Sequence, residues 1–223
     1  MKKIAAFITG LFLCSALFAQ TNEFKDFCKR NAESKIVRGD FELVQYNEKN
    51  KDAKRKSEGT FTLSVKDGII WFTKKPVAAT QVMMSTKIIQ EVRGRKKVID
   101  GKENPTFLSI AKITSSVFAG DYAEIEKNFD IEVFVINKFL EDGREEYDVE
   151  LTPKKDSAIV TFIKKISLSI CVYDDNAEAK GYKTCYISEF SMTDSGGGVS
   201  QYTLNNQIET DTLNTDEQKY FRE

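Results

Sequence analysis

The sequence predicts a mainly antiparallel β protein with a few helices, a fold of the α+β class. Short apolar runs with period-two alternation recur along the chain, as in strands with one buried face. Turn segments such as Asp67-Gly68 and residues 194–198 separate these runs at hairpin-like spacing. Residues 106–118 instead carry apolar side chains at helical spacing. Together, roughly ten short strands and one helical insert favour a large antiparallel sheet that curves toward a barrel.

Residues 1–19 are interpreted as a secretory signal peptide. Two lysines precede a short apolar run, and the small Ala19 ends a suitable cleavage site. The run is shorter than the about 20 apolar residues that a membrane span requires. The alternative is a lipid-modified Cys14, which the bulky residues before that cysteine disfavour. We therefore expect a soluble, exported chain with a single domain over residues 20–223.

The composition restricts the class of function. The chain is 41% hydrophobic and 30% charged, as globular domains are, and its net charge of -1 gives no basic excess for nucleic acid. It contains no histidine, which removes Ser-His-Asp and Cys-His sites and the commonest zinc ligand. The carboxylates form no recognisable motif. We expect no enzyme, metal or cofactor, and an enzyme that uses paired carboxylates remains the open alternative.

The chain after the signal peptide is predicted to begin with a helix and two strands. Apolar residues at offsets of three and four favour a helix over residues 21–34. Residues 36–46 follow as a strand with Phe41 on its apolar face. Gly39 lies on the same face and leaves room for a close neighbour. Residues 47–56 are rich in charge and are expected to form a solvated loop.

Residues 57–76 form the central hairpin of the predicted sheet. Phe61 lies on the apolar face of its first strand, which alternates with threonine and serine. Gly68 follows an aspartate in the turn, and the second strand carries Trp71, the only tryptophan. Pro76 ends this strand because proline has no N–H for the ladder.

Further strands are predicted on both sides of the helical insert. Each is a short apolar or alternating run between turn residues. They cover residues 77–85, 87–92 and 95–99 before the insert, and 131–136, 144–152, 158–162, 166–173, 182–192 and 199–208 after it. Thr215 to Gln218 fits a capping box for a short last helix.

Several short motifs follow one another in a definite order along the chain. They are Gly39-x-Phe41, Ser57-x-Gly59-x-Phe61-x-Leu63, Gly68-Ile69-x-Trp71 before Pro76, Gly120-Asp121 with Phe129, Tyr147-x-Val149-x-Leu151-x-Pro153, and Leu213-Asn214 with Glu217. In this order and spacing they resemble the bacterial outer-membrane lipoprotein carrier family, LolA and its relatives. The resemblance extends over nearly all of residues 20–223.

This resemblance implies a half-open β-barrel with a helical lid over an apolar cavity. The expected cavity residues are the inward side chains of the early strands: Phe41, Leu43, Phe61, Leu63, Trp71, Val82 and Met84. The expected lid residues form the underside of the insert: Phe107, Ile110, Ile113 and Val117.

The implied function is that of a periplasmic carrier. It binds acyl chains of lipoproteins or lipids and transfers them between envelope membranes. Its expected partners are an inner-membrane donor and an outer-membrane acceptor, with transient membrane contact. The alternative is a non-enzymatic module on the same fold, one that senses envelope lipids or acts structurally. A packed core would favour the structural module.

Three cysteines follow the signal peptide: Cys28, Cys171 and Cys185. If residues 166–173 and 182–192 form one hairpin centred on residue 178, Cys171 and Cys185 lie opposite each other. Opposed residues are close enough for a disulfide, which an exported compartment permits. We therefore predict a Cys171–Cys185 bond with Cys28 free. The alternative is a one-residue register shift, which places the two thiols on opposite faces.

Overall fold

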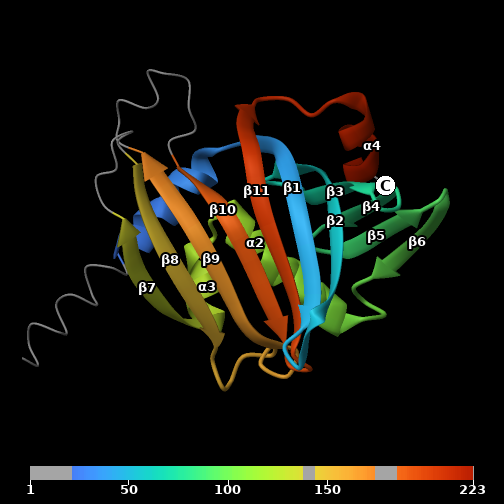
Figure 1. Ribbon diagram of the computed structural model, residues 1–223. Coiled ribbons are helices and arrows are strands. Elements are labelled where there is room, and N and C mark those ends of the chain that lie inside the picture. Colours follow the sequence, from blue (N-terminus) through green and yellow to red (C-terminus); the bar gives the residue numbers. More distant parts are fainter. Residues whose placement is uncertain (1–21, 138–143, 174–184, 223) are drawn as a thin grey trace, which may run out of the picture.

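The computed structural model describes residues 22–137, 144–173 and 185–222, apart from the side chains of Thr106 and Phe107. The predicted signal peptide lies outside the described residues. Within them, the strands form an 11-stranded antiparallel sheet in the order β6-β5-β4-β3-β2-β1-β11-β10-β9-β8-β7 (Figure 1). The strands are β1 (Ile36–Asn47), β2 (Asn50–Ser64), β3 (Gly68–Lys75), β4 (Ala79–Met83), β5 (Lys87–Val92), β6 (Arg95–Asp100), β7 (Phe129–Asn137), β8 (Arg144–Pro153), β9 (Ile163–Tyr173), β10 (Cys185–Asp194) and β11 (Gly198–Thr210).

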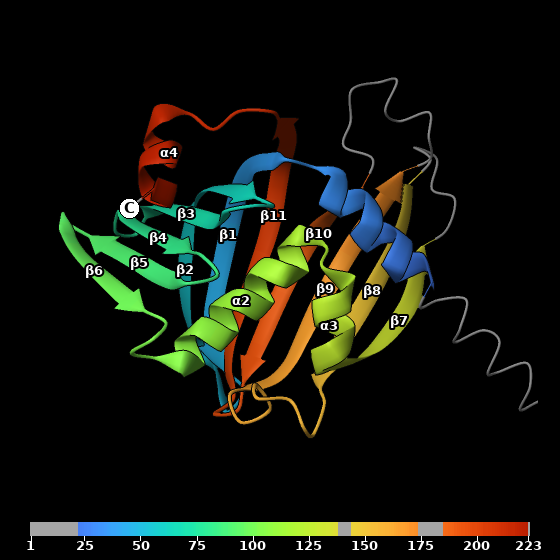
Figure 2. The same ribbon diagram turned by 180° about the vertical axis from the view of Figure 1, so that it is seen from behind.

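The sheet is strongly curved and does not close, because β6 and β7 lie at opposite ends of the strand order. Helix α2 (Pro105–Ala119), helix α3 (Tyr122–Asn128) and a helix over residues 22–33 cover its concave face (Figure 2). Helix α4 (Thr215–Arg222) packs on the other face. The predicted α+β class and curved, open sheet are therefore confirmed. None of the described helices is long and apolar enough to cross a membrane.

Two apolar clusters lie on the two faces of the sheet. Successive side chains of β3 point to opposite faces of the sheet. Ile69 and Trp71 belong to the large cluster under α2, whereas Ile70 belongs to the small cluster under α4. Gly39 permits one close contact in the large cluster, because a Cβ there would lie 2.7 Å from the Phe61 ring. The predicted role of this glycine is thus confirmed.

Two segments differ from their predicted conformation. Residues 50–56 belong to β2 rather than to a loop, although all of them are exposed. They pair with the end of β1. The polar composition therefore predicted their exposure to solvent correctly, but the loop conformation inferred from it is wrong. Residues 158–162 form turns rather than a strand, with hydrogen bonds from Phe162 and Ile163 N–H to the Ile159 carbonyl. The apolar run reflects the burial of Ile159 within these turns.

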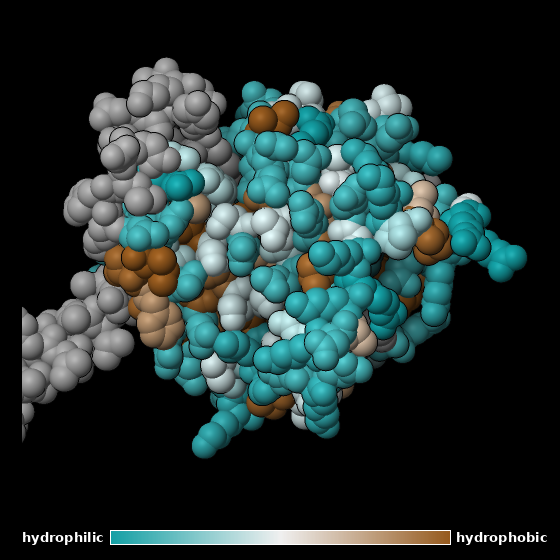
Figure 3. All heavy atoms as spheres, in the orientation of Figure 1, coloured by the Kyte–Doolittle hydropathy of each residue, from teal (hydrophilic) through white to brown (hydrophobic). Residues whose placement is uncertain are grey.

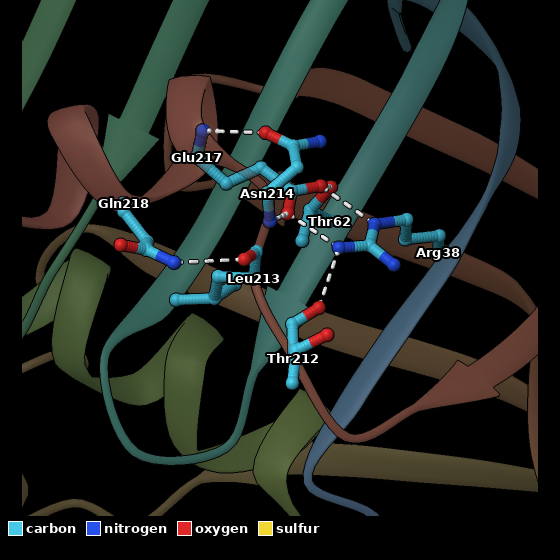
Figure 4. A network of polar contacts seen from close by, with 7 residues as sticks. All are labelled: Arg38, Thr62, Thr212, Leu213, Asn214, Glu217 and Gln218. Carbon is cyan, nitrogen blue, oxygen red and sulfur yellow. Dashed lines mark hydrogen bonds and ion pairs between the residues drawn. The ribbon is translucent and has the colours of Figure 1, made fainter.

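Helix α4 is fixed by a polar network around one buried carboxylate (Figure 4). Asn214 caps the helix: its side chain accepts a bond from Glu217 N–H at 2.9 Å, and Glu217 accepts one from Asn214 N–H at 2.7 Å. This is a capping box one residue earlier than predicted. Arg38 donates to both oxygens of Glu217 at 2.7 and 2.5 Å, and Thr62 donates at 2.7 Å.

Burial raises the pKa of Glu217, but the bonds from Arg38, Thr62 and Asn214 outweigh that effect and hold the pKa below its ordinary value. The carboxylate is therefore charged inside the interface between α4 and the sheet. This interface lies on the convex side and is separate from the layer under α2.

Candidate functional site

The candidate site is the apolar layer between the concave face of the sheet and helix α2. Trp71 is its centre and is only 4% exposed. Its indole lies 5.1 Å from the Phe41 ring and 5.6 Å from the Phe61 ring, centroid to centroid. These three predicted cavity residues therefore come together. Leu63 is buried in the same cluster, and the half-buried Leu43 packs against it.

The sequence interpretation missed two sheet residues that complete the layer. Tyr202 lies 4.6 Å from Trp71 between ring centroids, and Phe190 lies 6.0 Å from Tyr202. Both come from strands far along the chain, because β11 pairs with β1 and brings the C-terminal strands beside the N-terminal ones. The sequence did show an aromatic residue on an alternating strand in each case. Only the strand order, however, places these two rings near Trp71.

Val82 and Met84 were predicted in the same cavity, and this placement is wrong. Val82 lies opposite Ile70 and faces the convex side, where Met84 packs in the same small cluster. Met83 instead reaches the large cluster, since it lies opposite Ile69. Val82 and Met84 do share one face, as alternation predicts, but the pairing of Val82 with Ile70 turns that face to the convex side.

Helix α2 contributes the other half of the layer. Ile113 and Val117 are buried against the sheet as predicted, and Ile110 packs there partly buried. Phe118, which the expected underside omitted, lies 5.9 Å from Trp71 and 5.0 Å from Phe190 between centroids. The side chain of Phe107, also expected in the lid, lies outside the described part. The position expected for a lid is therefore occupied by α2.

Hydrogen bonds and close packing hold α2 at both ends: Gly101 N–H, just before the helix, donates to the Thr86 carbonyl at 3.0 Å. Asn31 donates a buried hydrogen bond of 2.6 Å to the Phe118 carbonyl. Gly120 ends the helix with φ +71°, and a Cβ there would lie 2.3 Å from the Cys28 carbonyl oxygen. At the other end, the N-cap Asn104 makes no side-chain capping bond. Apolar contacts along the helix and hydrogen bonds near both ends therefore hold α2 on the sheet.

Polar groups within α2 are incompletely satisfied. The hydroxyls of Thr114 and Ser115 are buried and have no hydrogen-bond partner among the described residues. Such an unsatisfied hydroxyl costs about 1–3 kcal/mol relative to a hydrated one.

The layer is filled by side chains, and its boundary carries a small depression. A cavity of about 350 Å³ lies between α2, α3 and the turns over residues 156–159. Its floor includes Ile113 and Ile159, which are both buried in the large cluster. Lys112 and Glu124 stand on its rim as an ion pair at 3.1 Å. The depression thus leads from a polar rim to the apolar layer beside the helix.

The titratable groups of the layer are held in their neutral forms. Burial raises the pKa of Cys28 to about 12, with smaller contributions from Cys185 and Asp121. Burial likewise raises the pKa of Tyr202 to about 12. A thiol or phenol of this kind is not an activated nucleophile near neutral pH. Among the described residues, no group of His, Cys, Asp or Glu is arranged to hold a metal ion.

The predicted Cys171–Cys185 disulfide is not formed in the structure. Cys185 lies opposite Val172, and Cys171 lies opposite Tyr186, so the register differs by one residue from the predicted one. The one-residue difference places Cys185 in the concave cluster and Cys171 on the other face. The alternative of two unlinked thiols therefore holds.

The geometry defines a class of protein: an open, curved β-sheet whose concave face is covered by a helix over an aromatic layer. Solved structures with a similar arrangement include a domain from Vibrio parahaemolyticus described as an outer membrane lipoprotein-sorting domain. It shares 14% identity, with 90% of this chain and 97% of that chain covered and a TM-score of 0.43.

A LolA superfamily protein from Nitrosomonas europaea matches at 12% identity, with 88% of this chain and 96% of that chain covered and a TM-score of 0.41. A DUF1329 family protein from Desulfovibrio piger matches at 12% identity, with 91% and 97% covered and a TM-score of 0.45. No family model matches the chain, and no curated protein is similar to it in sequence. All three matches have TM-scores below 0.5.

Proposed function

We propose that the protein is a non-enzymatic carrier that binds acyl chains of lipoproteins or lipids between helix α2 and the concave sheet face. The observation that carries the proposal is the aromatic layer itself. Phe41, Trp71 and Tyr202 on the sheet meet Phe118 on helix α2. Displacement of that helix exposes a continuous apolar surface suited to hydrocarbon. The lipoprotein-sorting description of the Vibrio parahaemolyticus domain is consistent with such cargo.

The energies of opening and loading are comparable. Opening exposes Ile113, Val117 and Phe118 together with the sheet side chains that they cover, and each such side chain costs roughly 1.5–3 kcal/mol to expose. The closed helix therefore stays in place without a ligand. An acyl chain gains about 0.8 kcal/mol per buried CH₂, so a chain of roughly 16 carbons offsets the opening. Loading and unloading then require an acceptor or a partner that offers the acyl chain a new apolar environment as it leaves the old one.

The proposed setting is the bacterial envelope. Residues 1–19 act as the signal peptide, and residues 20–223 form the exported carrier domain. The carrier receives acyl chains at the inner membrane from a donor and delivers them to an acceptor at the outer membrane.

The test uses Trp71, whose emission is the only tryptophan signal of the chain. Titration with a lysophospholipid below its micelle-forming concentration is expected to change this emission saturably, because the ligand replaces Phe118 against the indole. Mass spectrometry of organic extracts of the purified protein is expected to identify bound lipid. A protein that binds no lysophospholipid by isothermal calorimetry and contains no extractable lipid would refute the carrier.

A locked variant tests the movement of α2. Leu108 Cδ2 lies 2.5 Å from the position of a Cβ on Gly101, the residue that follows β6, and Gly101 N–H donates to the carbonyl of Thr86, the residue before β5. The double variant Gly101→Cys/Leu108→Cys, with the native cysteines replaced by alanine, is expected to form a disulfide that ties the first turns of α2 to the residue that follows β6. The oxidised form should load lipid much more slowly than the reduced form of the same variant. Equal rates would contradict the lid.

The filled layer favours one competing function, a structural or lipid-sensing module that binds a protein partner and keeps its interior packed. Trp71, Phe41 and Phe61 are each at most 4% exposed, as in a permanent core. The locked variant distinguishes the structural module from the carrier. Tying α2 down leaves the binding of a protein partner by a structural module unchanged, whereas it slows lipid loading by a carrier.

A further inference from the structure

The β5–β6 hairpin is an exposed projection at one edge of the sheet. Strand β6 is the last strand of the order, and its outer edge pairs with no other described strand. The hairpin extends sideways from the body in both ribbon views (Figures 1 and 2). Its two-residue turn is Arg93-Gly94, with positive φ at both residues. The hairpin is thus a well-formed element that reaches away from the site under α2.

The tip concentrates positive charge. Residues 92–98 include Arg93, Arg95, Lys96 and Lys97 and no acidic residue, in a chain whose net charge is -1. All of these residues are exposed. The nearest acid along the hairpin is Glu91, which lies opposite Lys96. A cluster of this kind attracts an anionic surface over about a Debye length, about 8 Å at physiological ionic strength.

The same end exposes apolar side chains. Val92 is 44% exposed and Val98 is 53% exposed, and they lie on opposite faces of the hairpin because Val92 opposes Arg95 and Val98 opposes Ile89. Val77, at 38% exposed, lies nearby in a depression of about 490 Å³ that Arg93 also lines. Figure 3 shows this end as hydrophilic surface with small hydrophobic spots.

A second basic segment shows what is particular to this tip. Residues 49–56 at the β1–β2 turn are also rich in lysine and arginine. Among the described residues, the exposed large hydrophobic side chains include none from that segment. Both segments are therefore basic, but of the two only the β5–β6 tip combines its positive charge with exposed valines on both faces.

We propose that the tip of the β5–β6 hairpin docks the protein on an anionic lipid bilayer. Arg93, Arg95 and Lys97 bind lipid phosphates, and Val92 and Val98 enter the interface between headgroups and acyl chains. The inference rests on the proposed function, since a carrier of acyl chains has to reach a membrane. It adds the surface that makes the contact and the lipid chemistry that this surface selects.

The experiment measures cosedimentation of the protein with vesicles. Wild-type protein is expected to bind phosphatidylglycerol/phosphatidylethanolamine vesicles, to bind phosphatidylcholine vesicles weakly, and to lose most binding in 0.5 M salt. The triple variant Arg93→Asn/Arg95→Gln/Lys97→Gln should bind about 100-fold more weakly, at roughly fivefold per cation. Asparagine is chosen for the first site because it tolerates the positive φ.

The matched control removes the same charge elsewhere: Lys51→Gln/Arg55→Gln/Lys56→Gln should change binding less than fivefold. A Val92→Ser/Val98→Ser variant should retain the salt dependence and bind several-fold more weakly. Absence of anionic vesicle binding by wild-type protein overturns the proposal and points to a protein partner. Equal losses in the two triple variants also overturn it, because binding then follows net charge alone.

Lysophospholipid binding in solution, followed by Trp71 emission, separates this proposal from the carrier. The tip variants should bind lysophospholipid as wild type does, since the tip is remote from Trp71. Vesicle docking without lysophospholipid binding would reject the carrier and leave the docking surface standing. Lysophospholipid binding without vesicle docking would reject the docking surface and leave the carrier standing.

Discussion

Replacing Arg38 with methionine tests the ion pair that holds helix α4 on the sheet. The substitution keeps an apolar stem of similar length and removes the two hydrogen bonds to Glu217. The carboxylate is 2% exposed, so water does not fully replace the guanidinium. Thr62 and Asn214 N–H remain as donors. We expect the free energy of unfolding to fall, and the aromatic layer under α2 to stay intact.

The expected loss in the free energy of unfolding follows from the burial of this ion pair. Breaking a buried ion pair by removing one partner costs roughly 3–5 kcal/mol. The Arg38 side chain is 27% exposed, and its partial hydration in the native protein reduces the loss. We therefore expect about 2–3 kcal/mol, which corresponds to roughly 5–10 °C in Tm for a chain of this size. Urea unfolding followed by circular dichroism measures the change.

Lys35→Met is the matched control. Lys35 and Asp211 form an ion pair of 2.8 Å, but both side chains are more than 70% exposed. The control should have no measurable effect on unfolding, because exposed ion pairs are screened by water. If Arg38→Met and Lys35→Met unfold alike, the buried network does not stabilise α4 and the reasoning is refuted. Lysophospholipid binding should be the same in both variants.

Acid titration tests the same network from the carboxylate. The folded-state pKa of Glu217 lies below its ordinary value, so its contribution is present above that ordinary value and is lost as the pH falls through the folded pKa. Glu217→Gln should therefore be less stable than wild type at pH 7. The difference should shrink below about pH 4. A difference that stays constant down to pH 2 would contradict the lowered pKa.

Three further predictions concern the helix end, a thiol and the N-terminus. Gly120→Ala should destabilise the protein by more than Gly94→Ala, because both glycines have positive φ but only the first meets backbone atoms within 4 Å; equal Tm losses would exclude the clash. Cys28 should resist iodoacetamide at pH 8 in the native protein and react after denaturation, since its pKa of about 12 leaves little thiolate, and rapid native labelling followed by mass spectrometry would contradict its burial. N-terminal sequencing of exported protein should begin at Gln20, and an acylated Cys14 would overturn cleavage after Ala19.

Local patterns in the sequence predicted the secondary structure well where a single physical cause dominated. Alternation of Phe61 with polar neighbours identified β2, and helical spacing around Ile113 identified α2. These patterns report which face of an element is buried, because burial of an apolar face is what creates them. Residues 158–162 show the limit: an apolar run without length or context is compatible with a strand or with buried turns.

The sequence by itself determined the fold class, the central hairpin and the apolar character of Phe41, Trp71 and the underside of α2. Only the tertiary structure decided which of these side chains meet. Tyr202 reaches Trp71 because β11 pairs with β1 across more than half of the chain. Val82 faces α4, and Cys171 and Cys185 lie on opposite faces, because the register of each strand pair decides the facing of every residue in it. Alternation specifies that two faces differ, whereas hydrogen-bond register between distant strands specifies which face points to the helix.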